Sequence, residues 1–288
     1  MANTKEVRKQ IASIKSTQKI TSAMEMVAAS KMKRTQDLMM VGRPYSNKIQ
    51  EVISHIATSN SEHSHPFYED RDVKKACFIV VSTDKGLCGG INTAVVKYST
   101  VLNAMNESSK FSIVGDKARA QLTRMFPKQV SNVVVDTTKQ PLTFSTACAL
   151  ADTIMEENAP KTQLVYNRFA SAISFKPTIA TVLSSEELEK AAEEGVNEFD
   201  SYEIEGPDRS EFLLDLSEFK MGALLYNAML ENNTSELGSR MQSMENSSKN
   251  ASEMLNKLTL LYNRTRQAAI TTELIEIISG ASSLESAE

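Results

Sequence analysis

The amino-acid sequence predicts an α/β protein in which two long terminal helices form an antiparallel coiled coil, with a compact α/β domain inserted between them. Helix-breaking residues are scarce, with 10 Gly and 7 Pro among 288 residues, and the two ends of the chain hold few of them. Between residues 73 and 183 the pattern changes to short apolar runs that alternate with helical stretches, which is typical of an α/β domain.

The N-terminal part of the chain has the pattern of one long helix. No Gly or Pro occurs in residues 1–41, and apolar or small side chains recur at helical spacing. Gly42-Arg43-Pro44 interrupts this pattern before it resumes, which predicts a coiled-coil helix over residues 1–57 with a kink. The residues of the stripe are Val7, Ile11, Ile14, Thr21, Met24, Ala28 and Met32.

The same part of the chain is basic. The first 43 residues carry nine Lys or Arg and three Asp or Glu. A solvated helix face accounts for this charge in the simplest way. Contact with an acidic partner is the second explanation, and contact with DNA is the weakest, because no aromatic residues are interleaved with the basic ones.

Residues 73–183 predict strands and helices in alternation, and therefore a sheet that is at least partly parallel. The expected strands are 76–81, 111–114, 132–135, 163–169 and 173–181, the last two arranged as a hairpin. The expected helices are 92–105, 117–125 and 146–158.

Two segments follow the α/β domain. Residues 184–207 are expected to form an acidic linker or an exposed rim, because 185–211 hold eleven Asp or Glu and two Lys or Arg without calcium-loop spacing. Residues 208–288 contain no Pro and predict the C-terminal coiled-coil helix.

A seam runs along this last helix, with alternating steps of four and three residues over more than four heptads. It matches the stripe on the first helix, so we expect the two helices to pair antiparallel within one chain. A homodimeric coiled coil would leave the first helix without a partner. The seam residues are Leu237, Met241, Met244, Ser248, Ala251, Leu255, Leu258, Tyr262, Thr265, Ala269 and Thr272.

Several classes of protein are excluded by composition and by missing motifs. A formal net charge of −4 excludes a strongly basic nucleic-acid binder, and no apolar run approaches the roughly 18 residues of a transmembrane helix. The first residues resemble neither a signal peptide nor a transit peptide. Cys77, Cys88 and Cys148 show no CxxC spacing, which favours a reducing intracellular compartment without disulfides or zinc.

Motifs for chemistry are also missing. His63-Ser-His65 lacks the supporting ligands of a metal site. No nucleophile, metalloprotease or cysteine–histidine pattern occurs, so we predict no catalytic, cofactor-binding or metal-binding residue.

One Gly-rich turn follows a predicted strand and precedes a predicted helix. A phosphate cradle would lie at such a place. The glycines at positions 86, 89 and 90 match neither GxxxxGK[ST] nor GxGxxG. From the residues alone a structural strand–helix turn is favoured, and a nucleotide site is the alternative.

Three segments together resemble the γ subunit of the F-type ATP synthase. They are Ile20–Met32 (ITSAMEMVAASKM), Ser82–Gly90 (STDKGLCGG) and Asn263–Ala281 (NRTRQAAITTELIEIISGA). The resemblance extends from Lys5 to Leu284, and its C-terminal motif is the most specific. It implies a coiled coil of the terminal helices with a Rossmann-like domain at its foot, and a Rossmann-like domain that binds no nucleotide.

The resemblance implies a rotor shaft instead of an enzyme. The shaft would turn inside a ring of α and β subunits, with its foot on the membrane-embedded c-ring beside an ε-type subunit. Proton flow would drive the rotation, and the shaft would change the nucleotide affinities of the β subunits. By resemblance, the residues that contact partners are Met24, Arg266, Gln267, Thr271 and Glu273.

The implied location is the cytoplasmic face of a bacterial plasma membrane, as a peripheral subunit, or alternatively the matrix side of the mitochondrial inner membrane. Two other functions stay open on the residues alone. A non-catalytic coiled-coil scaffold or adaptor would explain the long helices but not the C-terminal motif. A nucleotide-dependent enzyme would need the phosphate-binding and acid–base residues that the sequence lacks.

Overall fold

The computed structural model describes residues 4–58, 75–106, 108–139, 141–155, 161–182 and 209–285. The predicted acidic linker and the pair His63 and His65 lie outside these residues. The chain divides into two compact units. Residues 1–27 and 241–288 form one, called here the coiled-coil unit, and residues 28–240 form the other, called the α/β unit.

Five helices and five strands are found among the described residues. In chain order they are α1 (Thr4–Thr58), β1 (Lys75–Val81), α2 (Ile91–Ala104), β2 (Ser108–Val114), α3 (Asp116–Met125), β3 (Val130–Val134), α4 (Phe144–Met155), β4 (Lys161–Phe169), β5 (Phe175–Val182) and α6 (Arg209–Glu285). Every predicted strand and helix overlaps an observed one. α1 continues as a helix through Pro44, where a kink was expected.

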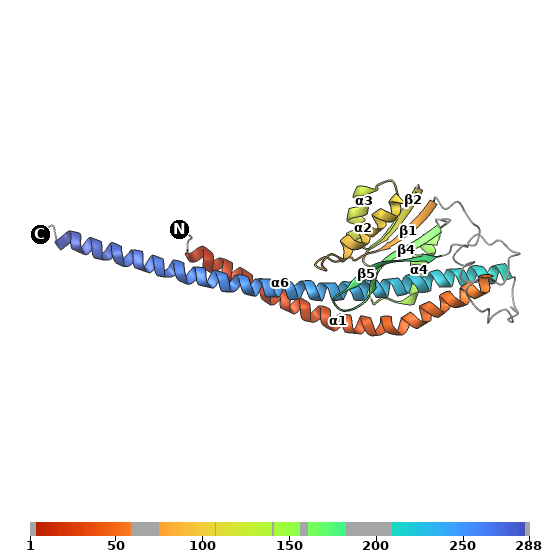
Figure 1. Ribbon diagram of the computed structural model, residues 1–288, viewed down its shortest axis with the longest axis horizontal. Helices are drawn as coiled ribbons and strands as arrows, with labels where there is room; N and C mark the ends of the chain where they lie inside the picture. Colours follow the sequence, from red (N-terminus) through yellow and green to blue (C-terminus); the bar gives the residue numbers. More distant parts are fainter. Residues whose placement is uncertain are drawn as a thin grey trace. The chain divides into compact units, whose positions relative to one another are not determined.

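The coiled-coil unit pairs the start of α1 with the end of α6, so the two helices run antiparallel (Figure 1). Along α6 the predicted seam positions from Met244 to Ala269 are buried or half-buried, and most residues between them are exposed. On α1 the stripe from Val7 to Met24 is likewise buried or half-buried. The predicted fold class is confirmed, because side chains that recur every 3.5 residues face a partner helix.

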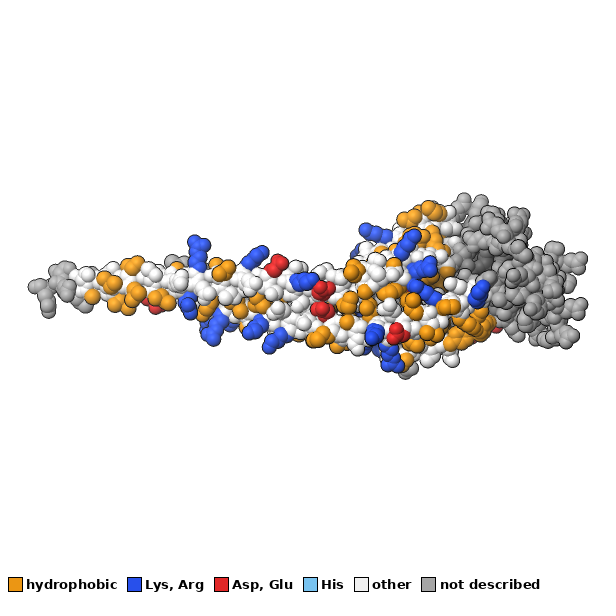
Figure 2. All heavy atoms as spheres, turned by 60° about the horizontal axis from the view of Figure 1, so that its bottom comes forward, with side chains coloured by type: hydrophobic (Ala, Val, Ile, Leu, Met, Phe, Trp, Pro, Cys, Tyr) orange, Lys and Arg blue, Asp and Glu red, His pale blue; other side chains and the backbone are white. Residues whose placement is uncertain are grey.

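Beyond the seam, α6 has no covering partner among the described residues. Thr272 was predicted as the last seam position but is exposed, as are all residues from Glu273 to Ser282, because no described residue packs against this end. In Figure 1 α6 continues past the N-terminus of α1, and Figure 2 shows hydrophobic side chains on the surface of this end. Several of the exposed side chains at this end are large and apolar: Leu274, Ile275, Ile277 and Ile278.

The α/β unit is built on one five-stranded sheet with the strand order β3-β2-β1-β4-β5. β1 pairs in parallel with β2 and β4, and β2 pairs in parallel with β3. β4 and β5 form the predicted antiparallel hairpin. The sheet is therefore mixed, with a parallel core and one antiparallel edge strand.

Helices cover both faces of this sheet, so the unit has three layers (Figure 1). On one face, Val95 of α2 and Leu122 of α3 pack on Phe78 and Phe111. On the other face, Leu225 of α6 lies in a cluster with side chains of α4 and of the strands. Strands buried on both faces read as continuous apolar runs, which explains the pattern of residues 76–81.

The part of α6 inside the α/β unit differs from its seam. Nearly every side chain from Lys220 to Leu237 is buried, whichever way it points. Buried polar side chains occur in this stretch, including Glu231, Asn232, Ser235 and Glu236. Buried polar groups need partners, and those partners define the site described next.

Candidate functional site

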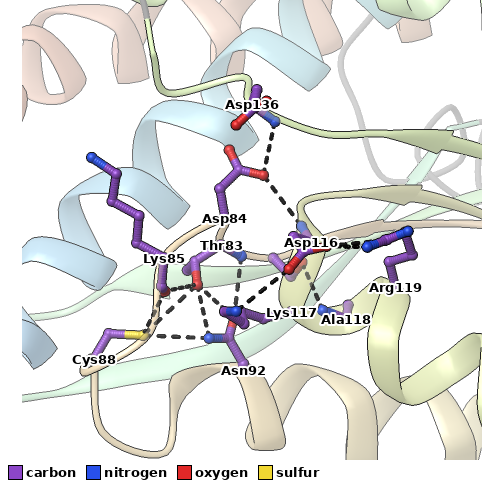
Figure 3. A network of polar contacts seen from close by, with 11 residues as sticks. Thr83, Asp84, Lys85, Cys88, Asn92, Asp116, Lys117, Ala118, Arg119 and Asp136 are labelled. Atoms are coloured by element: carbon purple, nitrogen blue, oxygen red, sulfur yellow. Dashed lines mark hydrogen bonds and ion pairs between the residues drawn. The ribbon is translucent and has the colours of Figure 1, made fainter.

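The Gly-rich turn joins the end of β1 to the start of α2 and is closed by its own side chains (Figure 3). Oδ1 of Asn92 accepts hydrogen bonds from the N–H of Thr83 at 3.1 Å and from its hydroxyl at 3.1 Å. The Asn92 amide donates to Sγ of Cys88 at 3.3 Å. Burial raises the pKa of the Cys88 thiol, so the thiol stays protonated and acts as a packing group.

The same turn caps the helix that follows β2. The first three N–H groups of α3 donate to Oδ1 of Asp84 at 3.2 Å, to the carbonyl of Thr83 at 3.0 Å and to Oγ of Ser82 at 3.2 Å. Asp84 also accepts the N–H of Asp136, just after β3, at 3.0 Å. At the N-terminus of α3, the N–H donors that could otherwise bind a phosphate are therefore bound to the chain's own oxygens (Figure 3).

Glycine is favoured at one point in this turn, Gly89, and required at one point beside it, Gly115. Gly89 has φ +62°, in the left-handed region. Gly115 has φ +105°, and a Cβ there would lie 2.5 Å from Oγ of Ser82 and 2.8 Å from its carbonyl carbon. The turn can therefore approach α3 closely only because position 115 carries no side chain. The backbone therefore accounts for glycine at positions 89 and 115, whereas a Cβ at Gly90 would meet nothing within 4 Å and one at Gly86 would meet only the Lys117 side chain at 4.0 Å.

A row of polar side chains on α6 binds the sheet and the Gly-rich turn from the face of the sheet that α4 and α6 cover. Asn232 donates to the carbonyl of Ser82 at 3.1 Å and accepts from Asn167 of β4 at 3.0 Å. Further along α6, Ser239 donates to the carbonyl of Cys88 at 2.5 Å, and Arg240 donates to that of Gly86 at 3.2 Å. We call Asn232, Ser235, Ser239 and Arg240 the polar row. Its members lie three to four residues apart, or next to each other, on one helix face.

One buried carboxylate joins three elements. Glu231 of α6, with a side chain 2% exposed, accepts from Nε and Nη2 of Arg43 on α1 at 2.5 and 2.9 Å. It also accepts from the N–H of Phe169 at the end of β4 at 2.8 Å, while Arg43 donates to the carbonyl of Phe169 at 2.7 Å. We call these three residues the bracket. The hydrogen bond that Arg43 donates to Glu231 raises the pKa of Arg43, so the guanidinium stays charged.

The residues that the resemblance marks as partner contacts all lie in the coiled-coil unit. Met24 is half-buried on α1, beside the buried Thr21. On α6, Arg266, Gln267, Thr271 and Glu273 are exposed, and the hydroxyl of Thr271 donates back to the carbonyl of Gln267 at 3.0 Å. Four of the five side chains are therefore exposed, and Met24 is half-buried.

Neither a metal cluster nor a membrane span occurs in the described part of the chain. Its His, Cys, Asp and Glu residues form no group of three or more that could hold a metal ion. No helix in the described ranges combines the length and the apolar character needed to cross a membrane.

Sequence reasoning found the Gly-rich turn and the seam but missed the polar row and the bracket. A signal for both exists in the sequence, because Glu231-Asn-Asn-Thr-Ser-Glu236 interrupts an otherwise apolar helical stretch. Polar residues that recur on one face of a buried helix indicate hydrogen bonds to neighbouring elements. Their partners, such as Arg43, cannot be read from that signal.

Comparison with known proteins identifies the class to which this architecture belongs. The family model described as ATP synthase matches residues 3–284. The mitochondrial ATP synthase subunit gamma of Arabidopsis thaliana is 44% identical over 99% of this chain and 87% of its own length. The ATP synthase gamma chain of Glaesserella parasuis is 39% identical over 99% of this chain and all of its own length.

Solved structures give the same result. A chain in the central stalk and c-ring of the Tetrahymena thermophila mitochondrial ATP synthase has a TM-score of 0.66 and 28% identity. The match covers 80% of this chain and 99% of that one. A chain of the Euglena gracilis mitochondrial ATP synthase has a TM-score of 0.75 over 98% of this chain and 94% of that one. At 22% identity, this second likeness speaks for the fold alone.

Proposed function

The chain belongs to the ATP synthase family as a γ subunit of the F1 sector, and we propose that it works as the rotating central shaft of that complex. It is a non-catalytic subunit of an enzyme whose reaction belongs to the complex as a whole. Because the chain belongs to this family, we reject both alternatives that the residues left open, the nucleotide-dependent enzyme and the independent scaffold.

One observation carries the proposal. A single helix, α6, is hydrogen-bonded to the sheet of the α/β unit in its first part and has an exposed end that can contact other subunits. The polar row and the bracket bind α6 to the sheet, to the Gly-rich turn and to α1. A torque applied to the α/β unit would therefore pass into α6 through directed hydrogen bonds as well as through apolar packing. Directed bonds resist sliding, whereas apolar contacts alone are non-directional.

The partners in this proposal are the α and β subunits around the coiled-coil unit, and the c-ring and an ε-type subunit at the α/β unit. Support comes from the similar Tetrahymena chain, which belongs to a central stalk with a c-ring. The exposed apolar side chains at the end of α6 also support it, because contiguous exposed apolar surface marks sites of interaction.

Rotation would act on the β subunits through unequal contacts. A shaft that touched all β conformations equally would shift none of them, so each angle must favour one conformation by a differential contact energy. Arg266 and Glu273 are exposed charged side chains that can exchange ion-pair partners as the shaft turns. Met24 has a neutral thioether, which can pass a partner surface without forming a fixed ion pair.

We propose the cytoplasmic face of a bacterial plasma membrane as the first candidate location, with the chain as a peripheral component, because the resemblance implies it. The matrix side of the mitochondrial inner membrane is the second candidate, and a specific observation favours it. The mitochondrial relatives of Ipomoea batatas and Arabidopsis thaliana are 43% and 44% identical to this chain, against 39% and 40% for the bacterial relatives of Glaesserella parasuis and Ralstonia nicotianae. Fractionation of source cells with an antibody to the chain would separate the two.

The rotor proposal is tested by watching the chain turn. Lys139, whose side chain is 70% exposed, is changed to Cys and biotinylated to carry a bead, and the chain is assembled with α and β subunits on a surface. ATP should then drive stepwise rotation of the bead in one direction. The control is the same complex with a non-hydrolysable nucleotide. A complex that hydrolyses ATP at full rate while the bead stays still would contradict the proposal.

A further inference from the structure

The outer edge of the sheet carries an unusual strand. β3 lies at one end of the strand order and pairs only with β2 among the described strands. Its sequence, Val130-Ser-Asn-Val-Val134, contains no charged residue, no Pro and no Gly. Natural sheets protect such edges with charges, prolines or covering elements, because an open edge can pair with another chain. A bulge near Ser131 is the single protective feature seen along β3 in the described structure.

The main-chain groups at this edge can be assigned from the pairing. The N–H of Gly115 donates to the carbonyl of Val134 at 2.8 Å, so the main chain of Val134 points towards β2. Because main-chain groups alternate along a strand, those of Val133 and Val135 point away from the sheet. The edge therefore offers hydrogen-bonding groups at every second residue, in the spacing that a further strand needs.

A shallow groove of about 890 Å³ runs between this edge and α3, and we call it the β3 groove. Val133 pairs with Ile113, which packs under α3, so its side chain lies on the same face as α3. Val133 and Val135 are 40% and 43% exposed, although they line the groove. Its wall on α3 is formed by Arg119, Ala120, Thr123 and Arg124.

The charge of the groove selects among possible occupants. Arg119 is bound to Asp116 at 2.5 Å, whereas Arg124 makes no hydrogen bond or ion pair to any described residue. A second copy of this chain, paired edge to edge, would bring a second Arg124 without an acid to pair with either one, because each Asp116 is already bound to its own Arg119, and like charges at close range are unfavourable. A strand with acidic and apolar side chains on its groove face would form an ion pair with Arg124 and pack against Val133 and Val135 at the same time.

We propose that the β3 groove is a docking site for an extended, acidic segment of another protein, which adds to the sheet as a strand beside β3. The main chain of β3 supplies the affinity through hydrogen bonds, and the groove supplies selectivity through its valines and arginines. This interaction does not depend on the rotor role, because it uses only the edge of the α/β unit.

The test uses the full chain and a defined probe. The probe is an eight-residue peptide with Thr at every second position and Val and Glu alternating between them. One control peptide has Lys in place of Glu, and another has N-methyl groups on the amides that would face β3. Binding is measured by fluorescence anisotropy, and hydrogen exchange followed by mass spectrometry locates it.

The acidic peptide should bind and slow exchange at residues 131–135. The lysine and N-methyl peptides should bind about tenfold more weakly or worse, because each lacks a charge-assisted or a main-chain hydrogen bond. Arg124→Glu should remove the preference for the acidic peptide, while Lys128→Glu, a nearby change of equal charge outside the groove, should keep it. Val133→Pro should block binding without loss of folding, because its N–H makes no bond within the sheet, and Val133→Thr should retain it.

Equal binding of the acidic and lysine peptides, or protection elsewhere than at β3, would overturn the proposal. It would equally fail if Val133→Pro, still folded by circular dichroism, bound like the parent chain. If the chain without peptide formed dimers in sedimentation experiments and β3 were protected in them, the occupant would be a second copy and the acidic segment would be rejected.

Discussion

Removal of the guanidinium from the bracket should destabilise the α/β unit more than the loss of any exposed ion pair on its surface. Arg43→Ala leaves the carboxylate of Glu231 with one remaining donor, the N–H of Phe169. The Glu231 side chain is 2% exposed, so water replaces the lost donors poorly, and breaking a buried pair on one side costs about 3–5 kcal/mol. Because Arg43 itself is 26% exposed, we expect the lower end, about 3 kcal/mol.

The assay is urea unfolding of the purified chain followed by circular dichroism, since the chain contains no Trp for fluorescence. Lys139→Ala is the matched control, because it breaks an ion pair of the same unit whose side chains are 70% and 51% exposed. Its cost should stay below about 0.5 kcal/mol. Arg43→Met, Glu231→Met and the variant that carries both then form a double-mutant cycle with the parent chain, with an expected coupling above about 1 kcal/mol.

The cycle separates the pair from the packing of its side chains. Replacing both partners by apolar groups of similar volume removes the buried charge as well as its partner, so the double variant should be more stable than Arg43→Ala. If Arg43→Ala cost no more than the Lys139→Ala control, or if the coupling were near zero, the bracket would not be what joins α1, β4 and α6.

Further predictions concern the rotor contact, the turn and a buried amine. Met24→Lys in the assembled complex should leave ATP hydrolysis intact but lower ATP-driven proton pumping on the same vesicles, because an acidic partner could hold the new charge in one rotational state; a loss of both in strict proportion would refute this. Gly115→Ala should destabilise the chain by more than about 2 kcal/mol in urea unfolding, since it adds strain at positive φ to a clash with Ser82. ATP with magnesium should leave the melting temperature of the isolated chain unchanged, and an upward shift would revive a nucleotide site at the Gly-rich turn. Burial lowers the pKa of Lys220 to about 8 from 10.5, so its charged form is penalised in the folded chain, and the free energy of unfolding should rise with pH between these values. Lys220→Met should therefore stabilise the chain by up to about 3 kcal/mol at pH 7 and by less than about 1 kcal/mol at pH 10, as measured by urea unfolding at both.

The parts of the fold that depend on local periodicity could be predicted from the sequence. Met244 and Ala251 were expected on the seam, and both are buried, because a 3.5-residue repeat places them on one helix face wherever the helix lies. β3 was expected at 132–135 and is found at Val130–Val134. The bulge beside Ser131 shifts the register of β3 against β2, and no local sequence pattern predicts a bulge.

The site was less accessible to prediction, because its contacts join residues far apart in the chain. Glu231 and Arg43 are separated by 188 positions, and Asp84 and Asp136 by 52. The sequence marks Asp84 only as part of a Gly-rich turn, and a turn of that kind can hold either a phosphate or a neighbouring helix. Which of the two it holds is decided by Gly115, whose missing side chain lets α3 approach. Contacts between residues that lie far apart in the chain produce no periodic pattern in the sequence.

The uncovered end of α6 has a consequence for the cell that makes the protein. Leu274, Ile275, Ile277 and Ile278 are 54–67% exposed on the chain by itself. A newly made subunit that waits for its partners would offer this apolar surface to chaperones, proteases and other unassembled copies. Its lifetime outside the complex would then be set by how fast the end is covered, so excess copies would be degraded instead of stored. The abundance of the subunit would follow the supply of its partners, even if its own gene were expressed more strongly.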